Sequence, residues 1–317
     1  MTHQAKLDVV IVISNPVRYQ SRYRLFTEFC DRMLNEPNVR LLAVELQQRG
    51  RPFVTNAQVK LRTKHEIWYK ENLINIGVQH LPRDWEYLAW IDADIEFQNK
   101  NWARDTIEQL QTYDIVQLFS HAVDLGPNGE AMMTHLGFNY LYVNGEQMAN
   151  YSPVSSGLKF GHTGYAFACR KSAYDAMGGL MEFPILGSGD AHMCMAWIGQ
   201  VTKTLHPDLH PNYKELAKIY EERCERHIQR NIGFVHGTIL HSWHGKKADR
   251  QYKTRWQILI RNQFDPLRDL KKDHNNLWQL ETTKPTLRDE IRMYFRQRHE
   301  DSIDVGSDFT NLKRHWI

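Results

Sequence analysis

An apolar run that ends in two carboxylates is the feature that most constrains this chain. Tyr87 to Ile91 is predicted to be a buried strand, and Asp92 and Asp94 follow it one residue apart. Carboxylates at the end of a strand can hold a divalent cation against a diphosphate, because their oxygens suit Mg²⁺ and Mn²⁺. The Asp-x-Asp pattern is common at strand ends, so the surrounding sequence decides what it means.

Strands and helices alternate through the first 120 residues. Apolar runs predict strands at 7–14, 39–46, 86–91 and 114–119, and helical spacing predicts helices at 21–35, 64–78 and 101–112. This alternation predicts an α/β fold with a mostly parallel sheet covered by helices on both faces. Ligands of such sheets bind beyond the carboxyl ends of the strands, which is where Asp92 and Asp94 are expected.

The remainder of the chain is expected to complete the same unit. Residues 121–165, rich in Gly, Asn, Ser and His, are predicted to form loops and short strands over a pocket. A late strand is expected at 234–241, and helices at 171–177, 190–198, 213–228, 249–262 and 286–298. We expect a first domain over residues 1–247, divided at about residue 120. Residues 248–317 would form a basic, helical C-terminal extension.

Composition and charge exclude some classes of protein. The chain is 42% hydrophobic and 24% charged, as in soluble globular proteins, and runs such as Val9 to Ile13 are too short to span a bilayer. The N-terminus has no secretion segment and the four cysteines are scattered, so a cytoplasmic location is expected. Residues 246–300 carry 14 Lys or Arg against 8 Asp or Glu, which suggests a polyanionic partner, a diphosphate or a solvated helical face.

Metal ligands are expected from two distant segments. Asp94 is the better ligand candidate, and Asp92 could reach the ribose, a metal-bound water or the metal itself. One carboxylate makes a poor site, so a histidine from the segment after residue 240 would complete it, and imidazole favours Mn²⁺ over Mg²⁺. His241 and His244 are three residues apart, so only one needs to face the metal, and His244 is preferred.

Basic residues follow these histidines. Gly245 would let the backbone approach a phosphate, and Lys246, Lys247 and Arg250 could neutralise a diphosphate leaving group. The alternative is a strand histidine followed by the basic start of a helix.

A candidate acid or base follows another apolar segment. Gly187-Ser188-Gly189 forms a flexible turn, and Asp190 then lies at or near the N-cap of a helix. The helix dipole would stabilise its charged form there, and the carboxylate could deprotonate an acceptor hydroxyl. An ordinary N-cap aspartate explains the same position equally well.

These segments together resemble the GT-A fold of nucleotide-sugar glycosyltransferases, closest to the family-2-like group, over residues 7–247. The resemblance rests on their order: a first strand Asp8 to Ser14, a second ending near Glu45, a helix with Lys64, Asn72, Asn75 and Gly77, the Asp92-Ala93-Asp94 pair, Gly161 to Arg170, Gly178 to Glu182, Gly187 to Asp190, and His244. It implies a Rossmann-like, mostly parallel sheet with helices on both faces. Residues 1–247 would then be a GT-A catalytic domain, with a nucleotide-sugar half to about residue 120 and an acceptor half over 121–247, followed by the C-terminal helical extension.

The resemblance also implies a function. The donor would be a nucleotide-diphosphate sugar, with UDP favoured, and the acceptor a hydroxyl of a glycan, a small molecule or a modified DNA base. Metal at Asp94 and His244 would stabilise the departing diphosphate, and Asp190 would act as base in an inverting displacement. Further contacts to the nucleotide are expected from Ser14, Asn15, Pro16, Arg18, Arg22, Glu45, Lys60, Arg62 and Lys64.

The chain departs from the family pattern at two places. Gly189-Asp190 stands where many relatives have two adjacent acids, and the Q-x-x-R-W segment of processive relatives is missing. A soluble enzyme that transfers single sugars is therefore favoured over a membrane polysaccharide synthase. Both stereochemical outcomes stay open, as does the identity of the sugar.

Three other functions compete with this hypothesis. Haloacid-dehalogenase-like phosphatases also place Asp-x-Asp after an apolar strand, although usually near the chain start. A non-catalytic nucleic-acid-binding protein could use the basic and aromatic C-terminal region. A glycosyltransferase acting on a hydroxylated DNA base would combine both ideas, and salt-dependent DNA binding would distinguish it.

Overall fold

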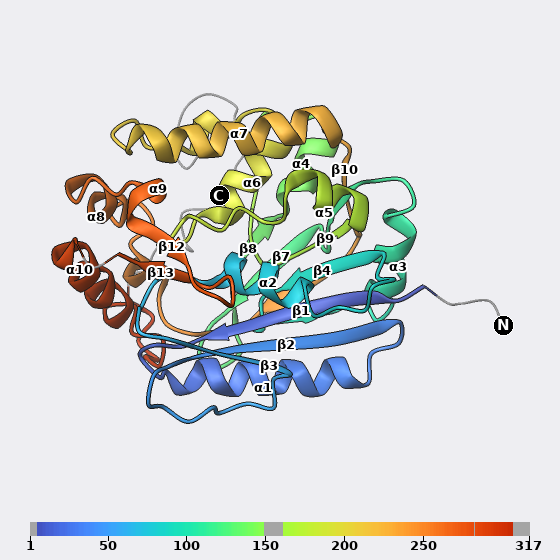
Figure 1. Cartoon of the computed structure of the whole chain (residues 1–317). Helices are drawn as coiled ribbons and strands as arrows, with labels where there is room; N and C mark the ends of the chain where they lie inside the picture. The colour runs from blue at the N-terminus through green and yellow to red at the C-terminus, as the bar shows by residue number, and fades with distance from the viewer. Residues whose placement is uncertain (1–4, 149–160, 282, 307–317) are drawn as a thin grey trace.

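A seven-stranded sheet forms the centre of the molecule (Figure 1). The computed structural model describes residues 5–148, 161–281 and 283–306. The strand order is β10-β6-β9-β4-β1-β2-β3. These strands are β1 Leu7–Ser14, β2 Val39–Gln48, β3 Val59–Thr63, β4 Tyr87–Ile91, β6 Ile115–Gln117, β9 Ala166–Arg170 and β10 Ile232–Phe234. Only β9 runs antiparallel to its neighbours β4 and β6, which confirms the mostly parallel α/β sheet.

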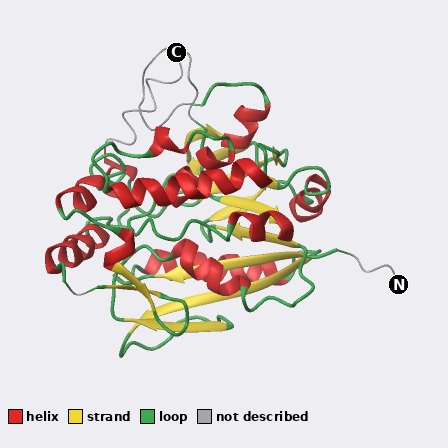
Figure 2. Cartoon of the chain, turned by 45° about the horizontal axis from the view of Figure 1, so that its top comes forward, coloured by secondary structure: helices red, strands yellow, loops and turns green. Residues whose placement is uncertain are grey.

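Helices cover both faces of this sheet (Figures 1 and 2). Successive side chains of a strand point to opposite faces, so Val10 of β1 joins one hydrophobic core while Val9 and Ile11 join the other. Helix α1 buries Phe26 and Phe29 in the second core. The helices are α1 Gln20–Leu34, α2 Lys70–Val78, α3 Trp102–Gln109, α4 Phe138–Val143, α5 Lys171–Met177, α6 Gly189–Trp197 and α7 Pro211–His227, with a 3-10 turn at Val201–Thr204.

Helix α2 lies very close to β1 and β2. A Cβ atom added at Gly77 would lie 2.6 Å from Cγ1 of Val10 and 3.1 Å from Cγ2 of Val44. The predicted helix at 64–78 was too long, because β3 occupies Val59–Thr63 and the backbone N–H of Trp68 donates to Ile185 instead of to a helical carbonyl. The helix therefore begins at Lys70, and its first turn faces the carboxyl ends of β1 and β4.

A second sheet joins distant segments beside the end of β4. Its order is β5-β11-β7-β8, with β5 Ile95–Phe97, β7 His121–Leu125, β8 Ala131–Leu136 and β11 Thr238–His241. The predicted strand at 234–241 is divided between two sheets, because β10 pairs with β6 and β11 pairs with β7. Strand β11 also pairs antiparallel with β5, and this register places His241 opposite Ile95.

The C-terminal part packs against the same end of the sheet. It contains a 3-10 turn Lys247–Arg250, α8 Trp256–Arg261, α9 Pro266–Asp269, the hairpin β12 Leu270–Lys272 and β13 Trp278–Leu280, and α10 Pro285–Arg296. The predicted helix at 249–262 is interrupted, because Gln251 adopts a left-handed backbone with φ of 50°. After α10 the chain reaches α1, where the Asp301 carboxylate accepts hydrogen bonds from the backbone N–H groups of Gln20 and Ser21.

In the described part of the chain, every helix is too short or too polar to cross a membrane.

Candidate functional site

One cavity of about 570 Å³ lies beyond the carboxyl ends of β1 and β4. It contains both acidic segments and the late basic segment that the sequence singled out. The predicted site residues that line it are Ser14, Asn15, Pro16, Arg22, Asp92, Asp94, Asp190, His241, His244, Lys247 and Arg250. The fold therefore gathers residues from the beginning, middle and end of the chain around one space.

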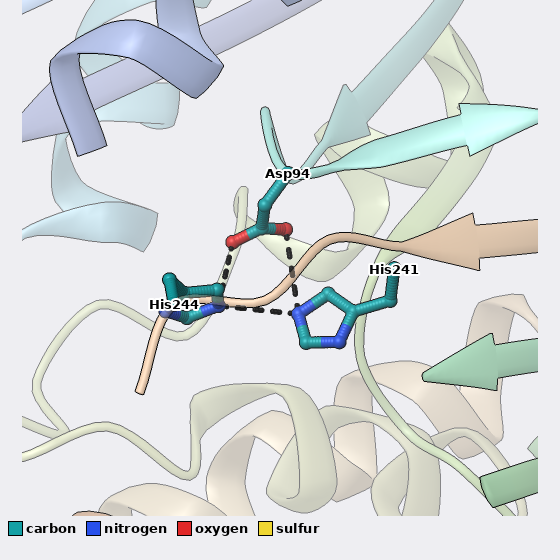
Figure 3. Close-up of side chains that lie close together, drawn as sticks. All are labelled: Asp94, His241 and His244. Atoms are coloured by element: carbon teal, nitrogen blue, oxygen red, sulfur yellow. Dashed lines mark hydrogen bonds and ion pairs between the residues drawn. The ribbon is translucent and has the colours of Figure 1, made fainter. Parts of the chain in front are cut away.

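Asp94, His241 and His244 form a compact, buried group in the lining of this cavity (Figure 3). His244 Nε2 lies 3.0 Å from Asp94 Oδ2, and His241 Nε2 lies 3.8 Å from Asp94 Oδ1. The two Nε2 atoms are 3.2 Å apart. The expectation that only one histidine faces this site was too narrow, because both rings point at the same carboxylate.

The backbone explains why both histidines converge. His241 ends β11 directly opposite Ile95, and the backbone N–H of Ser242 donates to the carbonyl of Asp94 at 2.8 Å. Gly245 has a φ of 84° and lies so close to residues 298–300 that a Cβ would approach a backbone oxygen at 2.8 Å. The chain thus turns tightly after the strand, and a three-residue spacing on a turn brings both rings inward.

A second carboxylate fixes the orientation of His241. Asp124 on β7 is buried, and its Oδ1 lies 2.8 Å from His241 Nδ1. A hydrogen bond there keeps the proton on Nδ1, so Nε2 presents its lone pair to Asp94 and His244. The same carboxylate accepts from Tyr165 Oη at 2.6 Å and contacts Lys247. Burial would raise the pKa of Asp124, but its histidine and lysine partners hold it far below its usual range.

The protonation states at this end of the cavity suit a metal ion. Burial would raise the pKa of Asp94, but His244, His241 and Arg22 hold it well below the usual value, and Arg22 lies 3.1 Å away. Burial and the nearby Arg250 lower the pKa of His244 to about 3, so its ring is neutral. Metal ligands must be ionised carboxylates and neutral imidazoles, and the lowered pKa values of Asp94 and His244 both favour those forms.

The ligand atoms also fit a divalent transition metal. Oδ1 of Asp94 is buried and has no hydrogen-bond partner within the described ranges. Two imidazole nitrogens and a carboxylate oxygen suit Mn²⁺ better than Mg²⁺, which prefers oxygen ligands alone. A cation held between these three side chains would satisfy the orphaned oxygen and the two facing nitrogens together.

Asp92, the other member of the acidic pair, points elsewhere. Its Oδ1 contacts Nζ of Lys70, the first residue of α2, and it is outside the group formed by Asp94 and the two histidines. A role for Asp92 in binding ribose or metal stays a prediction. Sequence reasoning missed Lys70, because the helix was expected to begin six residues earlier, at Lys64.

Asp190 lies in the first turn of α6 and lines the same cavity. The N-cap position belongs to Ser188, with a φ of 76°, so Asp190 is inside the helix and not at its cap. Its Oδ1 accepts a hydrogen bond from the N–H of Ala191 at 2.8 Å. Contrary to the expectation that the helix would favour the ionised form, burial raises the pKa of Asp190, and Lys70 and the Ala191 N–H only partly oppose it. A carboxyl with raised proton affinity suits a general base near neutral pH.

Six of the predicted nucleotide contacts lie outside the lining of the cavity. Four of them are exposed, namely Arg18, Lys60, Arg62 and Lys64, and Lys246 pairs with Asp304 at 2.7 Å. Glu45 is fully buried and accepts hydrogen bonds from the backbone N–H groups of Val54 and Thr55. Their roles in binding a nucleotide stay predictions.

The C-terminal segment contributes to the cavity. Phe295, Arg298 and Glu300 line it, and Arg22 bridges Glu300 and Asp94 through ion pairs of 3.3 and 3.1 Å. The division at residue 247 between a catalytic domain and an extension stays a prediction, but the described part of the extension forms one wall of the site.

Comparisons with known proteins give structural likenesses only. No family model matches the chain, and no curated protein matches it in sequence. A Drosophila β-1,4-galactosyltransferase 7 mutant, in complex with manganese, UDP-Gal and xylobiose, is 13% identical with a TM-score of 0.34. The match covers 60% of this chain and 60% of that chain, so it spans less than two thirds of the galactosyltransferase structure.

A second solved structure matches over a greater length. It is a protein from Desulfovibrio desulfuricans described as a nucleotide-diphospho-sugar transferase, 11% identical, with a TM-score of 0.35 over 93% of this chain and 99% of that chain.

Proposed function

We propose that this protein is a metal-dependent glycosyltransferase that moves a sugar, in the hexosyltransferase class, from a nucleotide diphosphate to a hydroxyl acceptor. The observation that carries the proposal is the convergence of Asp94, His241 and His244 at the end of β4. This buried set of one carboxylate and two imidazoles opens on the same cavity as Asp190.

The donor would lie between the end of β1 and this set of ligands. Ser14, Asn15 and Pro16 follow β1 and line the cavity, which suits the nucleoside part of a UDP-sugar. Asp94, His241 and His244 would hold Mn²⁺, or Mg²⁺ less favourably. When bound, the cation would act as a Lewis acid that stabilises charge on the departing diphosphate.

Cationic side chains would assist the same leaving group. Lys247 and Arg250 line the cavity next to the histidines, and Arg22 contacts Asp94. Positive charges placed where the diphosphate acquires its extra charge stabilise the transition state more than the ground state.

Asp190 would act on the acceptor side. The acceptor oxygen forms a bond to the anomeric carbon of the sugar while the bond from that carbon to the diphosphate oxygen breaks. The acceptor proton passes to the carboxylate of Asp190, whose raised pKa makes it a better base than an exposed aspartate.

Thermal unfolding with a panel of nucleotide-diphosphate sugars, with and without Mn²⁺, tests the proposal. A ligand that binds only the folded protein raises the unfolding midpoint by mass action. We expect UDP-sugars to raise it in the presence of Mn²⁺, and free sugars to leave it unchanged. Release of UDP should accompany the shift. A shift with inorganic phosphate or nucleic acid alone, and with no nucleotide sugar, would contradict the proposal.

A further inference from the structure

A second buried carboxyl lies beside Asp190. Glu71 stands in the first turn of α2, is 4% exposed and lines the cavity. Its Oε2 accepts a hydrogen bond from Nε1 of Trp68 at 3.1 Å. Nothing in the sequence around Glu71 distinguishes it from the other polar residues of the helix, so only the fold reveals its position.

Gly189 makes room for this carboxyl. A Cβ atom added at Gly189 would lie 3.1 Å from Oε1 and from the carboxyl carbon of Glu71. The space next to Asp190 that a side chain at 189 would occupy is therefore filled by Glu71. Helices α2 and α6 thus bring together two carboxyls, although the local sequence of α6 supplies only one.

The ammonium group of Lys70 interacts with Glu71, Asp190 and a third carboxyl, that of Asp92. Lys70 contacts Asp92, and burial would lower its pKa, but Asp92, Glu71 and Asp190 together raise it, so it stays charged. The charged groups that act on Glu71 are Lys70, Asp190 and Asp92. Burial, the largest influence, and the charge of Asp190 raise the pKa of Glu71 to about 7, whereas Lys70 opposes the rise. Glu71 therefore keeps its proton until near-neutral pH.

We propose that Glu71 is a positioning residue for sugar transfer, which acts through Asp190 by placing a negative charge next to it. This inference rests on the proposed function. Above about pH 7, where Glu71 is itself ionised, its charge opposes the pull of Lys70 and Arg255 on the neighbouring carboxylate, and so keeps Asp190 basic enough to take the acceptor proton. No bond to Glu71 forms or breaks in the reaction.

The pH dependence of UDP release, with a UDP-sugar as donor and water as acceptor, tests this role in Glu71→Gln. In the wild type, the two coupled carboxyls should give an ascending limb that spans two ionisations. In Glu71→Gln the limb should move to lower pH, span one ionisation and reach a plateau about 10-fold lower, because a weaker base transfers the proton less well. A uniform loss at every pH, with the limb unmoved, would show a merely structural role and overturn the inference.

Glu182→Gln is the matched control. Glu182 accepts hydrogen bonds from Asn72 and Asn75 of the same helix, but it is not among the residues that line the cavity. Its variant should unfold at a lower temperature and keep the wild-type limb. A limb that moves equally in both variants would also overturn the inference.

Thermal unfolding without donor gives an independent measurement. A carboxyl whose pKa is raised on folding adds stability at low pH, and this is lost as the pH rises through the folded value. Between about pH 5 and pH 7, the unfolding midpoint of the wild type should therefore fall relative to that of Glu71→Gln. Above about pH 7, the difference between the two midpoints should stay constant. A constant difference between the two midpoints over the whole pH range would contradict the inference.

The assay of UDP release distinguishes failure of this role from failure of the proposed function. Absence of UDP release from the wild type with every donor would overturn the proposed function and this role together. UDP release with the same ascending limb in the wild type and in Glu71→Gln would overturn this role alone.

Discussion

Two groups of carboxyls in the cavity lining have pKa values that are shifted in opposite directions. At the proposed metal end, formed by Asp94, His241 and His244, the two histidines and Arg22 hold the pKa of Asp94 well below the usual range in spite of burial. At the proposed acceptor end, formed by Asp190 and Glu71, burial dominates and raises the pKa values of both carboxyls. Burial acts to raise the pKa of all three carboxyls, so burial alone does not explain the difference.

The groups that face each carboxyl explain it. Two imidazoles and Arg22 surround the carboxylate of Asp94, whereas the single cation Lys70 is shared among Asp92, Glu71 and Asp190. An ionised oxygen is what a metal requires, and a carboxyl that retains affinity for protons is what a base requires. The same side-chain chemistry is therefore divided into two roles by its neighbours.

Removal of the metal ligand is expected to have the largest effect. Asp94→Asn should lower metal-dependent UDP release by about 1,000-fold or more, because Lewis-acid stabilisation contributes several kcal/mol. The Mn²⁺-dependent rise in unfolding midpoint should disappear with it. Asp175→Asn, which alters an exposed aspartate paired with Lys171, should leave both measurements unchanged. Wild-type turnover in Asp94→Asn would remove the metal assignment.

Asp190→Asn should lower the rate of transfer without changing the binding of metal and donor. We expect UDP release to fall by about 100- to 10,000-fold, the usual contribution of a positioned base. The Mn²⁺-dependent midpoint shift with a UDP-sugar should persist, because the metal ligands are unchanged. The wild-type rate should rise with pH along a limb above the ordinary aspartate value of 3.8, since burial raises the pKa. Loss of this limb in the variant, measured from pH 4 to pH 9, checks the assignment.

The metal end was largely predictable from sequence. The apolar run before Asp92 predicted a strand, which the structure contains as β4. Parallel strands present their carboxyl ends at one edge of the sheet, so the end of this strand also predicted the position of Asp94. The second histidine was missed because a spacing of three residues puts side chains of a strand on opposite faces. His244 lies instead on the turn after β11, where Gly245 reverses the chain.

The acceptor end was predictable only in part. The Gly187-Ser188-Gly189 turn located Asp190, but its proton affinity depends on burial and on Lys70, which belong to the tertiary structure. Glu71 gave no local signal, since a glutamate in the first turn of a helix is ordinary. The contribution of Arg298 and Glu300 to the cavity wall could not be anticipated either, because it depends on where the chain returns after α10.

A substitution behind the metal ligands should have an intermediate effect. Asp124→Asn keeps the shape of the side chain but removes the charge that orients His241, so the affinity for Mn²⁺ should fall by about 10- to 100-fold. Titration of Mn²⁺, followed by the electron paramagnetic resonance of the free ion, measures this directly. Asp114→Asn, on a partly exposed aspartate paired with Arg170, is the control. Unchanged Mn²⁺ affinity in Asp124→Asn would show that the orientation of His241 does not depend on that carboxylate.

Substitution of the two lysines after His244 should give the smallest effects. The two variants test which of these adjacent side chains belongs to the donor site. Lys247 lines the cavity and contacts Asp124, so Lys247→Ala should raise the KM for a UDP-sugar by about 10-fold through the loss of a charge near the diphosphate. Lys246 pairs with the exposed Asp304 and is outside the cavity lining, so Lys246→Ala should change KM by less than about twofold. The sequence alone assigned both lysines to the diphosphate, whereas the fold turns adjacent side chains to different surroundings. Equal effects of the two variants would extend the donor site across the turn after β11.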